Sequence, residues 1–330
     1  MTPLSELLPR ALDARSAWLE TLTDTDTWRV FHGAVEGRPG LTIDRYGPVL
    51  LIQSFRELPE KADLDDIEAF ARDQLDWAEA VVWNHRGKDP VDAPALDAAM
   101  DREHVVKEEG MRFMFRPRHR GNDPWLFLDF RAGRRAVRAR AAGARMLNLF
   151  SYTCGAGVAA GVGGAASVRN VDFSESALKI GKDNGSMNLP KKSVFHTDQA
   201  NVLPAMRQLS GQKVRGRGGR KPYKRFAPET FDLIVLDPPT FSRSPFGAVD
   251  SVRDYASMFK PCVLSVAKGG AILATNHVST VDREEWMAGL RRCAEKAGRP
   301  LTDVEVIVPD ADFPSPDGRN PLKMAWCTVS

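Results

Sequence analysis

Residues 148–157 read NLFSYTCGAG and follow a short apolar run that begins at Arg145. A helical segment comes next, opened by Gly155 and Gly157. A glycine-rich turn between strand and helix lets the backbone approach a ligand closely and directs helix N-terminal amides toward a negative group. The third glycine of a GxGxxG motif is missing, and nicotinamide enzymes use similar turns. The stretch predicts a ligand-binding loop at the carboxyl end of a parallel strand.

Two further predicted strands end at carboxylates. Residues 166–171 lead to Asp172, where a carboxylate can accept both ribose hydroxyls of a nucleoside. Residues 194–197 lead to Asp198, which is placed either to bind an adenine amino group or to cap a helix that begins near residue 200. An adenosine with two polar ends fits this arrangement, and no second nucleotide is required.

The sequence DPPTF at residues 237–241 follows another apolar run, residues 231–236. Two consecutive prolines cannot continue a strand, so they predict a rigid loop at the same edge of the sheet. Such a loop can hold a polar group and an aromatic ring against a planar substrate. We expect Phe241 to face the substrate, because a strand end followed by Ser-Arg-Ser-Pro is a poor place for a core aromatic.

The order of predicted elements separates a small domain from a large one. Residues 1–24 have the apolar spacing of a helix. Residues 25–120 combine short strands, a helix and turns marked by glycine and proline, which indicates a small α+β module. Residues 121–330 alternate strand and helix patterns and close with two strands that can pair as a hairpin. This alternation predicts a parallel sheet covered by helices, with an antiparallel edge.

Residues 211–225 read GQKVRGRGGRKPYKR and interrupt this alternation. The segment has almost no apolar content, so we expect a loop that does not pack into the core. Two roles are open for it: a solvated insertion, or an arm that binds phosphate, because nothing acidic offsets its charge. Its candidate substrate-binding residues are Arg215, Arg217, Arg220 and Lys221.

Composition narrows the class of protein. The chain has 330 residues, of which 43% are hydrophobic, enough for a full core and more than one domain. The net charge of +3 is too small by itself to indicate nucleic acid. The four cysteines are widely spaced, which predicts neither a metal site nor disulfides. No run approaches ~18 apolar residues, so we expect a cytoplasmic protein without a membrane segment or signal peptide.

Three motifs together resemble class I S-adenosylmethionine-dependent methyltransferases, and specifically the bacterial large-subunit ribosomal RNA methyltransferases that modify cytosine or guanine. Residues 126–131 resemble the opening segment of that group, residues 148–153 its cofactor loop and residues 237–241 its catalytic loop. The similarity reaches the N-terminal module through residues 37–47, which read GRPGLTIDRYG.

The resemblance implies a Rossmann-like α/β fold with a seven-stranded sheet, S-adenosylmethionine as cofactor and ribosomal RNA as substrate. It places the ribose at Asp172, the adenine at Asp198 and the methionine end at residues 151–157. The RNA-binding PUA module of the cytosine branch is not found, so RNA binding falls to residues 28–120 or to the basic segment. The residues expected to bind the cofactor are Asp129, Arg131, Asn148, Phe150, Ser151, Tyr152, Thr153, Gly155, Asp172, Phe173, Asp198 and Gln199; those expected to be catalytic are Asp237, Pro238, Pro239 and Phe241.

The cysteines bear on which atom receives the methyl group. Methylation of cytosine at carbon needs a thiolate that first attacks the ring, yet the loops at residues 237–241 and 274–278 contain no cysteine. Cys154 lies in the cofactor loop, on the wrong side for attack on a base. The other three cysteines fit buried positions in predicted helices and the last strand: Cys262, Cys293 and Cys327.

A guanine ring nitrogen already offers a lone pair, so positioning of the base can carry the catalysis. Asn276 and His277 resemble the corresponding segment of the guanine-N7 branch, where either side chain could contact the substrate. His277 fits a loop histidine with a structural hydrogen bond equally well. The leading hypothesis is therefore methylation of a guanine ring nitrogen in ribosomal RNA.

The motifs leave other functions open. The same cofactor could serve methylation of a small molecule or a protein, or methylation of cytosine at C5. A catalytically silent RNA-binding factor could retain the fold. A nicotinamide dehydrogenase is disfavoured, because the glycine pattern is incomplete and the DPPTF loop has no role there.

Overall fold

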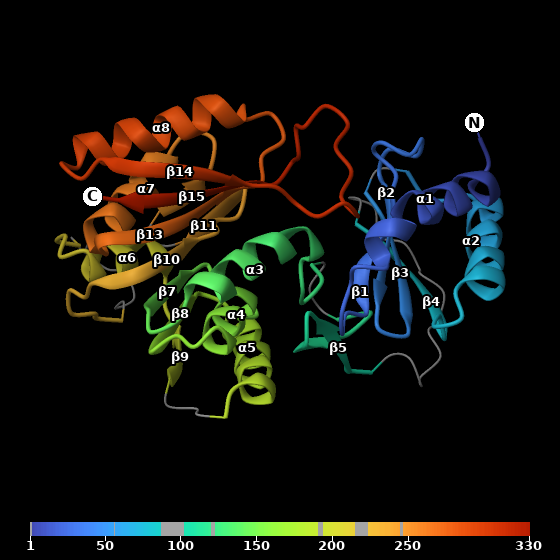
Figure 1. Cartoon of the computed structure of the whole chain (residues 1–330), viewed down its shortest axis with the longest axis horizontal. Coiled ribbons are helices and arrows are strands. Elements are labelled where there is room, and N and C mark those ends of the chain that lie inside the picture. The colour runs from blue at the N-terminus through green and yellow to red at the C-terminus, as the bar shows by residue number, and fades with distance from the viewer. Residues whose placement is uncertain are drawn as a thin grey trace. The chain divides into compact units, whose positions relative to one another are not determined.

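The computed structural model describes residues 2–55, 57–86, 102–119, 123–190, 194–214, 224–244 and 247–330 (Figure 1). The chain forms two compact units. Unit 1 comprises Met1–Asp129 together with Asp310–Gly318, and unit 2 comprises Phe130–Pro309 together with Arg319–Ser330. The chain therefore leaves unit 2 after Pro309, contributes a short loop to unit 1 and returns.

Unit 1 contains a four-stranded sheet in the order β1-β2-β3-β4. The first three strands form an antiparallel meander, whereas β4 is parallel to β3 because a helix crosses between them. The elements of unit 1 are α1 (Leu4–Leu19), β1 (Thr27–His32), β2 (Leu41–Tyr46), β3 (Val49–Ser54), α2 (Lys61–Gln74), β4 (Ala80–His85), β5 (His104–Glu108), β6 (Met111–Phe115) and the 3-10 turn Leu128–Phe130. Strands β5 and β6 pair as an antiparallel hairpin.

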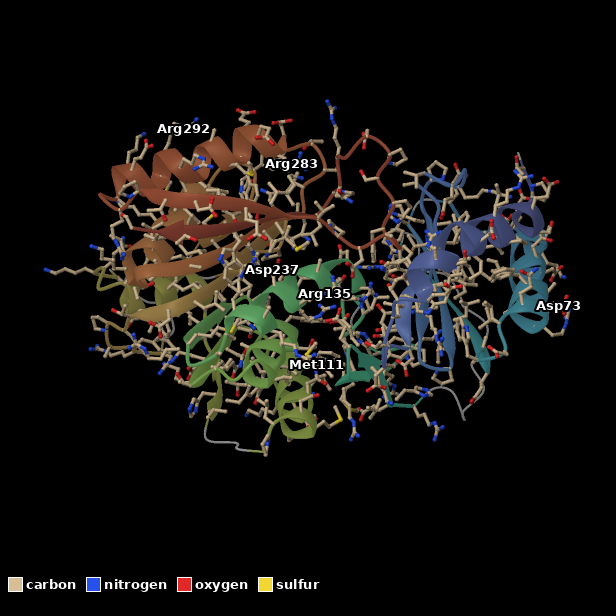
Figure 2. All side chains as sticks on the ribbon, in the orientation of Figure 1. Asp73, Met111, Arg135, Asp237, Arg283 and Arg292 are labelled. Atoms are coloured by element: carbon tan, nitrogen blue, oxygen red, sulfur yellow. The ribbon has the colours of Figure 1, made fainter. Side chains whose placement is uncertain are left out.

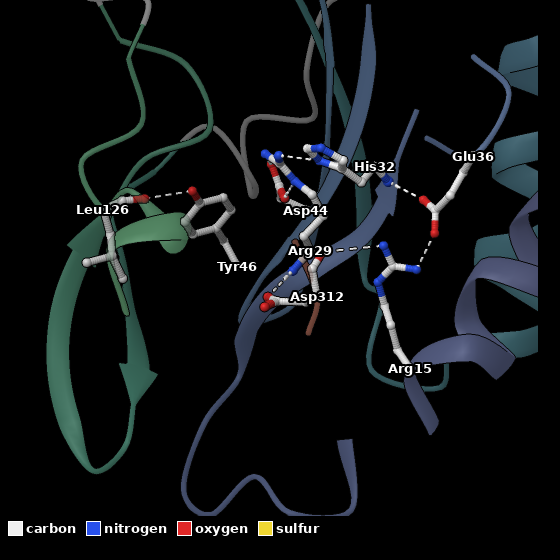
Figure 3. A network of polar contacts seen from close by, with 8 residues as sticks. All are labelled: Arg15, Arg29, His32, Glu36, Asp44, Tyr46, Leu126 and Asp312. Atoms are coloured by element: carbon white, nitrogen blue, oxygen red, sulfur yellow. Dashed lines mark hydrogen bonds and ion pairs between the residues drawn. The ribbon is translucent and has the colours of Figure 1, made fainter. Parts of the chain in front are cut away.

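A polar network crosses the core of unit 1 (Figure 3). Arg29 forms a bidentate ion pair with Asp44, with nitrogen–oxygen distances of 2.8 and 3.0 Å. The carboxylate of Asp312, which is fully buried, accepts the Arg29 backbone N–H at 3.0 Å. The guanidinium of Arg29 also lies over the ring of Phe313, 4.4 Å from its centroid. These contacts explain why residues 310–318, far along the chain, fold as part of unit 1.

Unit 2 contains a seven-stranded sheet in the order β14-β15-β13-β10-β7-β8-β9. Its elements are α3 (Arg131–Arg140), β7 (Arg145–Leu149), α4 (Gly155–Val162), β8 (Ser167–Asp172), α5 (Glu175–Asn188), β9 (Phe195–Gln199), α6 (Val202–Leu209), β10 (Phe231–Leu236), β11 (Phe241–Ser244), β12 (Gly247–Asp250), α7 (Tyr255–Ser265), β13 (Val266–Asn276), α8 (Arg283–Lys296), β14 (Leu301–Ile307) and β15 (Lys323–Val329). The strands from β13 to β9 are parallel, and β15 and β14 add an antiparallel edge.

Helices cover both faces of this sheet (Figure 1). Side chains from α6, α7 and α8 share one apolar core with Leu147, Leu149 and other residues of one sheet face. Helix α4 packs against β7 and β8, with α3 and α5 beside it. This layered α/β architecture is the one predicted from the alternation of strand and helix patterns in the sequence.

One element departs from the expectation of a simple loop. The residues after the two prolines form a short antiparallel hairpin, in which Phe241 is opposite Asp250 and Ser244 is opposite Gly247. The sequence FSRSPFGAVD lacks a regular alternation of apolar residues and contains proline and glycine, so its local pattern favours a loop. No helix among the described residues is long and apolar enough to cross a membrane.

Candidate functional site

The predicted site residues of unit 2 gather at one edge of the sheet. Strands β7, β8, β9, β10 and β13 are parallel neighbours, so the loops after them lie together at their carboxyl ends. Binding sites of open α/β sheets form at this edge. Figure 2 shows Asp237 here, at the end of β10. The sheet topology therefore assembles groups that are more than a hundred residues apart in the sequence.

The loop after β7 is strained. Phe150, Tyr152 and Cys154 have φ angles of 57°, 48° and 63°, a left-handed conformation that costs non-glycine residues energy. Two hydrogen bonds stabilise it against the neighbouring strand: Tyr152 N–H donates to Asp172 Oδ2 at 2.9 Å, and Ser151 N–H donates to the Val171 carbonyl at 3.2 Å. Strain that the surroundings maintain in this way is typical of ligand-binding loops.

Asp172 connects the two loops that are expected to bind the nucleoside. Besides Tyr152, its carboxylate accepts the N–H of Ser174 on Oδ1 at 2.8 Å. Burial raises the pKa of Asp172, and these amide hydrogen bonds oppose the shift without cancelling it. Each oxygen of a carboxylate offers two acceptor positions, so these bonds leave acceptor capacity for ribose hydroxyls. Phe173, which follows, has 56% of its surface exposed.

Helix α5 packs against the strained loop through Gly181 and Asn184, two residues that were not predicted from the sequence. Asn184 is fully buried and donates from Nδ2 to the Thr153 carbonyl at 3.0 Å. A Cβ at Gly181 would lie only 2.3 Å from Cys154 Sγ. Gly181 and Asn184 lie one helical turn apart and so face the loop together. A glycine inside a helical pattern, followed one turn later by asparagine, was the available sequence signal.

Asn148 occupies a position inside the sheet. Its Nδ2 donates to Asn170 Oδ1 on β8 at 2.9 Å, and only 2% of its surface is exposed. A Cβ at Gly157 would lie 2.1 Å from the same Asn170 oxygen. Gly157 therefore allows α4 to pack closely on the pair. The structure gives the side chain of Asn148 the role of joining β7 to β8 beside the strained loop.

Asp198 lies on β9 with 15% of its side chain exposed. Lys224 Nζ lies 2.6 Å from its Oδ1, and Arg169 Nη1 lies 3.3 Å from its Oδ2. The alternative that Asp198 caps the following helix is wrong: α6 begins at Val202, and Asn201 accepts the capping N–H of Leu203. An adenine amino group at Asp198 would therefore share the carboxylate with Lys224. Gln199, the next residue, is exposed.

Asp237 is fixed by two residues at the end of β13. Its Oδ1 lies 2.7 Å from His277 Nε2 and accepts the hydroxyl of Thr275. Burial acts to raise the pKa of Asp237, but the His277 imidazole and the two hydrogen bonds outweigh it. The positive charge of Arg134 adds to them, and the pKa is held below its ordinary value. Asp237 is therefore a carboxylate at neutral pH, and 27% of its side chain is exposed.

Asn276 is buried directly beside this pair. Its Nδ2 donates to the Ser251 carbonyl at 3.0 Å, and its Oδ1 accepts the N–H of Val278 at 2.9 Å. Both ends of the amide are thus used within the chain, which leaves His277, with 32% of its side chain exposed, as the group that faces outward. The sequence had placed Asn276 and His277 together as candidate substrate contacts; the geometry assigns them different tasks.

The loop between Asp237 and the hairpin presents an aromatic ring. Pro238 is buried and Pro239 is half-buried, whereas Phe241 has 55% of its surface exposed. A core role for Phe241 is therefore excluded. An exposed aromatic ring in the same short segment as a carboxylate suits a flat, polar-edged ligand, because a base can stack on the ring while its edge forms hydrogen bonds.

The start of α3 supplies buried positive charge. Arg131 and Arg134 have 1% and 2% of their surface exposed, and the Arg134 guanidinium lies 5.8 Å from the centroid of the Phe130 ring. Asp129 lies in the turn that precedes the helix and is half-buried. Arg215, Arg217, Arg220 and Lys221 lie outside the described residues.

The cysteines lie in apolar surroundings. All four are free and buried. Burial raises the pKa of Cys154 and of Cys327 to about 12, and it raises the pKa of Cys262 and Cys293. Thiols in such surroundings are poor nucleophiles, because the reactive form is the thiolate. Within the described part of the chain, no group of His, Cys, Asp or Glu side chains could hold a metal ion.

Comparison with known proteins points to one family. Residues 28–325 match the family model described as S-adenosylmethionine-dependent methyltransferase. A protein named ribosomal RNA large subunit methyltransferase, from Deinococcus radiodurans, is 29% identical over 307 residues, covering 88% of this chain and 70% of its own. Ribosomal RNA large subunit methyltransferase I of Escherichia coli K12 is 27% identical over 302 residues, covering 90% of this chain and 72% of its own.

Solved structures share the fold. The methyltransferase SMU.776, crystallised with S-adenosylhomocysteine, superposes with a TM-score of 0.80 at 20% identity and covers 98% of this chain and 80% of its own. A methyltransferase from Agrobacterium tumefaciens superposes with a TM-score of 0.62 at 16% identity, covering 88% and 87%. These likenesses confirm the predicted Rossmann-like class I α/β fold with a small N-terminal domain.

Proposed function

We propose that this chain, which belongs to the S-adenosylmethionine-dependent methyltransferase family, methylates a base of large-subunit ribosomal RNA. The family establishes S-adenosylmethionine as the methyl donor, so a nicotinamide cofactor is excluded. The RNA substrate is inferred from relatives in Deinococcus radiodurans and Escherichia coli, whose names state that activity and which align with most of this chain.

The residues at the carboxyl edge suit this cofactor. Asp172 has acceptor capacity for ribose hydroxyls, and the exposed Phe173 beside it offers an apolar surface for adenine. The strained loop around Tyr152, supported by Asn184, would surround the methionine end. When bound, S-adenosylmethionine supplies an electrophilic methyl group on a sulfonium. The chain must then exclude water and place a nucleophilic atom of the substrate in line with that methyl.

We further propose that the nucleophile is a ring nitrogen of guanine. The observation that carries this proposal is the carboxylate of Asp237, held by Thr275 and His277 in the same short DPPTF segment that carries the exposed ring of Phe241. A ring nitrogen attacks with its own lone pair and needs only orientation, whereas C5 of cytosine first needs a thiolate. The four buried thiols with raised pKa values speak against the cytosine reaction.

Asp237 and Phe241 then have separate tasks. A base that has left its stack lies against Phe241, and its edge donates an N–H to Asp237. Methylation of a neutral purine ring nitrogen such as N7 leaves a positive charge on the base. A fixed carboxylate close to the ring stabilises that developing charge, and no proton has to be removed in the transfer step. His277 keeps the carboxylate oriented and ionised.

The direct test is transfer of labelled methyl from S-adenosylmethionine into RNA from a strain that lacks this gene, followed by nucleoside analysis. Naked RNA and intact ribosomal subunits are assayed in parallel, because the accessible form of the substrate differs between them. We expect labelled methylguanosine. Labelled 5-methylcytidine would overturn the assignment of the nucleophile while leaving the RNA substrate in place.

The same assay separates the remaining functions. Cofactor binding with no incorporation into either RNA preparation, but labelling of proteins or small molecules in a cell extract, would replace RNA by another substrate. Failure to bind S-adenosylmethionine at all, with RNA binding retained, would favour a catalytically silent RNA-binding factor.

A further inference from the structure

Ser251 lies between the hairpin β11–β12 and α7 and is buried, with only 2% of its surface exposed. Its hydroxyl donates to the Pro239 carbonyl at 2.8 Å, and its backbone N–H donates to the Thr240 carbonyl at 3.2 Å. Its own carbonyl accepts Nδ2 of Asn276 at 3.0 Å. Ser251 therefore uses its side chain and both of its backbone polar groups to join the DPPTF loop to β13.

The composition of that loop makes it depend on such a residue. Pro238 and Pro239 have no backbone N–H, so this part of the loop can accept hydrogen bonds but cannot donate any. The carbonyl groups of this part of the loop therefore need donors from elsewhere in the chain. Ser251 supplies two donors: its hydroxyl binds the carbonyl of Pro239, and its backbone N–H binds the carbonyl of Thr240. Its hydroxyl thus fixes the backbone two residues from Asp237.

The opposite side of Asp237 is tied to the same residue. The side-chain amide of Asn276 donates to the Ser251 carbonyl and accepts the N–H of Val278. Asn276 precedes His277 and Val278 follows it, so these bonds fix the backbone on both sides of His277. His277 in turn contacts Oδ1 of Asp237. Ser251 therefore forms hydrogen bonds both with the loop that carries Asp237 and with Asn276, the residue before His277.

We propose that Ser251 is a positioning residue that sets the geometry of the Asp237–His277 pair. The inference rests on the proposed function, in which that pair orients a base for methyl transfer. Displacements of about 1 Å in a reacting assembly can cost about 10²-fold in rate. Loss of the Ser251 hydroxyl is thus expected to lower kcat, with little effect on KM for RNA or on the affinity for S-adenosylmethionine.

The test compares Ser251→Ala with a matched control, Ser265→Ala. Ser265 is also buried, with 3% of its surface exposed, and its hydroxyl also donates to a proline carbonyl, that of Pro261, at 2.9 Å. It lies at the end of α7 and contacts no residue of the DPPTF loop in these hydrogen bonds. Both variants lose one buried hydroxyl bond, so both are expected to melt at a similarly lowered temperature.

Only Ser251→Ala is expected to reduce kcat for methyl transfer, by about tenfold or more. Equal kcat values for the two variants, at equal loss of thermal stability, would reduce Ser251 to a purely structural residue. A rise in KM at unchanged kcat would likewise overturn the proposal, because it would place Ser251 in substrate binding.

A second readout does not depend on the RNA substrate. The imidazole resonances of His277, assigned with a His277→Gln variant, are expected to move in Ser251→Ala and to stay in place in Ser265→Ala. Unmoved resonances in Ser251→Ala would refute the positioning role even if the wild type methylates RNA. Moved resonances, in a wild type that methylates no RNA, would keep the geometric inference and reject the proposed substrate.

Discussion

His277 Nε2 lies 2.7 Å from Asp237 Oδ1, although the two residues are 40 positions apart in the sequence. They meet because β10 and β13 are parallel neighbours, and each residue follows the carboxyl end of its strand. The contact gives the carboxylate one orientation and helps to keep it ionised. An anionic group with a fixed direction, in the same DPPTF segment as an exposed aromatic ring, is the feature on which the proposed chemistry depends.

Replacement of this carboxylate tests its role most directly. Asp237→Ala is expected to lower kcat for methyl transfer by about 10²–10³-fold, the usual cost of removing one preorganised electrostatic partner of a transition state. Isothermal titration with S-adenosylmethionine should give nearly the wild-type dissociation constant, because the cofactor is expected to contact other loops. Asp232→Ala, at the opposite end of β10 where it pairs with Arg145, is the control and should retain activity.

The cysteine-free mechanism makes its own prediction. Cys154→Ala should transfer methyl groups at nearly the wild-type rate, because burial raises the pKa of this thiol to about 12 and keeps it protonated. The same is expected for Cys262→Ala. A variant that binds S-adenosylmethionine normally but no longer transfers its methyl would show that a thiol takes part after all.

The close approach of α5 to the cofactor loop can be tested with one methyl group. In Gly181→Ala the added Cβ would lie 2.3 Å from Cys154 Sγ, so the loop must shift. We expect weaker binding of S-adenosylmethionine, by about tenfold, measured by titration calorimetry. In the control Gly289→Ala, within α8, the added Cβ meets only the end of the Arg292 side chain at 3.9 Å. That variant should bind normally and gain roughly 0.5–1 kcal/mol of helix stability.

The lowered pKa of Asp237 predicts how stability depends on pH. Folding favours the ionised form, so the contribution is complete above the unfolded-state pKa of about 3.9 and is lost as pH falls through the lower folded-state value. The difference in free energy of unfolding between wild type and Asp237→Asn should shift in favour of the variant as the pH falls from about 5 to below about 4. Urea unfolding at several acidic pH values measures it; a difference that stays unchanged from about pH 5 to about pH 3 would contradict the lowered pKa.

The buried ion pair of unit 1 predicts a large effect on stability alone. Asp44→Ala would leave the Arg29 guanidinium without its bidentate partner, which typically costs about 3–5 kcal/mol in a buried pair. Asp65→Ala, which removes a solvent-exposed partner of Lys61, is the control and should leave the melting temperature nearly unchanged. Destabilisation of similar size in both variants would show that the Arg29–Asp44 pair is not specially important.

The sequence predicted the element types well because their signals are local. The alternation of apolar runs with helical segments in residues 121–330 indicated the parallel sheet, and the closing hairpin appears as β14 and β15. The carboxyl-edge motifs could also be found in sequence, since strained turns, double prolines and strand-end carboxylates are recognisable one loop at a time. The fold class and the methyl donor followed from these motifs and from the resemblance that they carry.

Only the tertiary structure decided which of these groups act on one another. The Asp237–His277 contact, the support of the cofactor loop by Asn184 and the link from Ser251 to Pro239 join segments that are distant or unpatterned in sequence. A hydrogen bond between such segments depends on strand order and on helix packing, which no local window of residues encodes. The sequence alone thus determined the parts of the site, and long-range packing determined how they are held together.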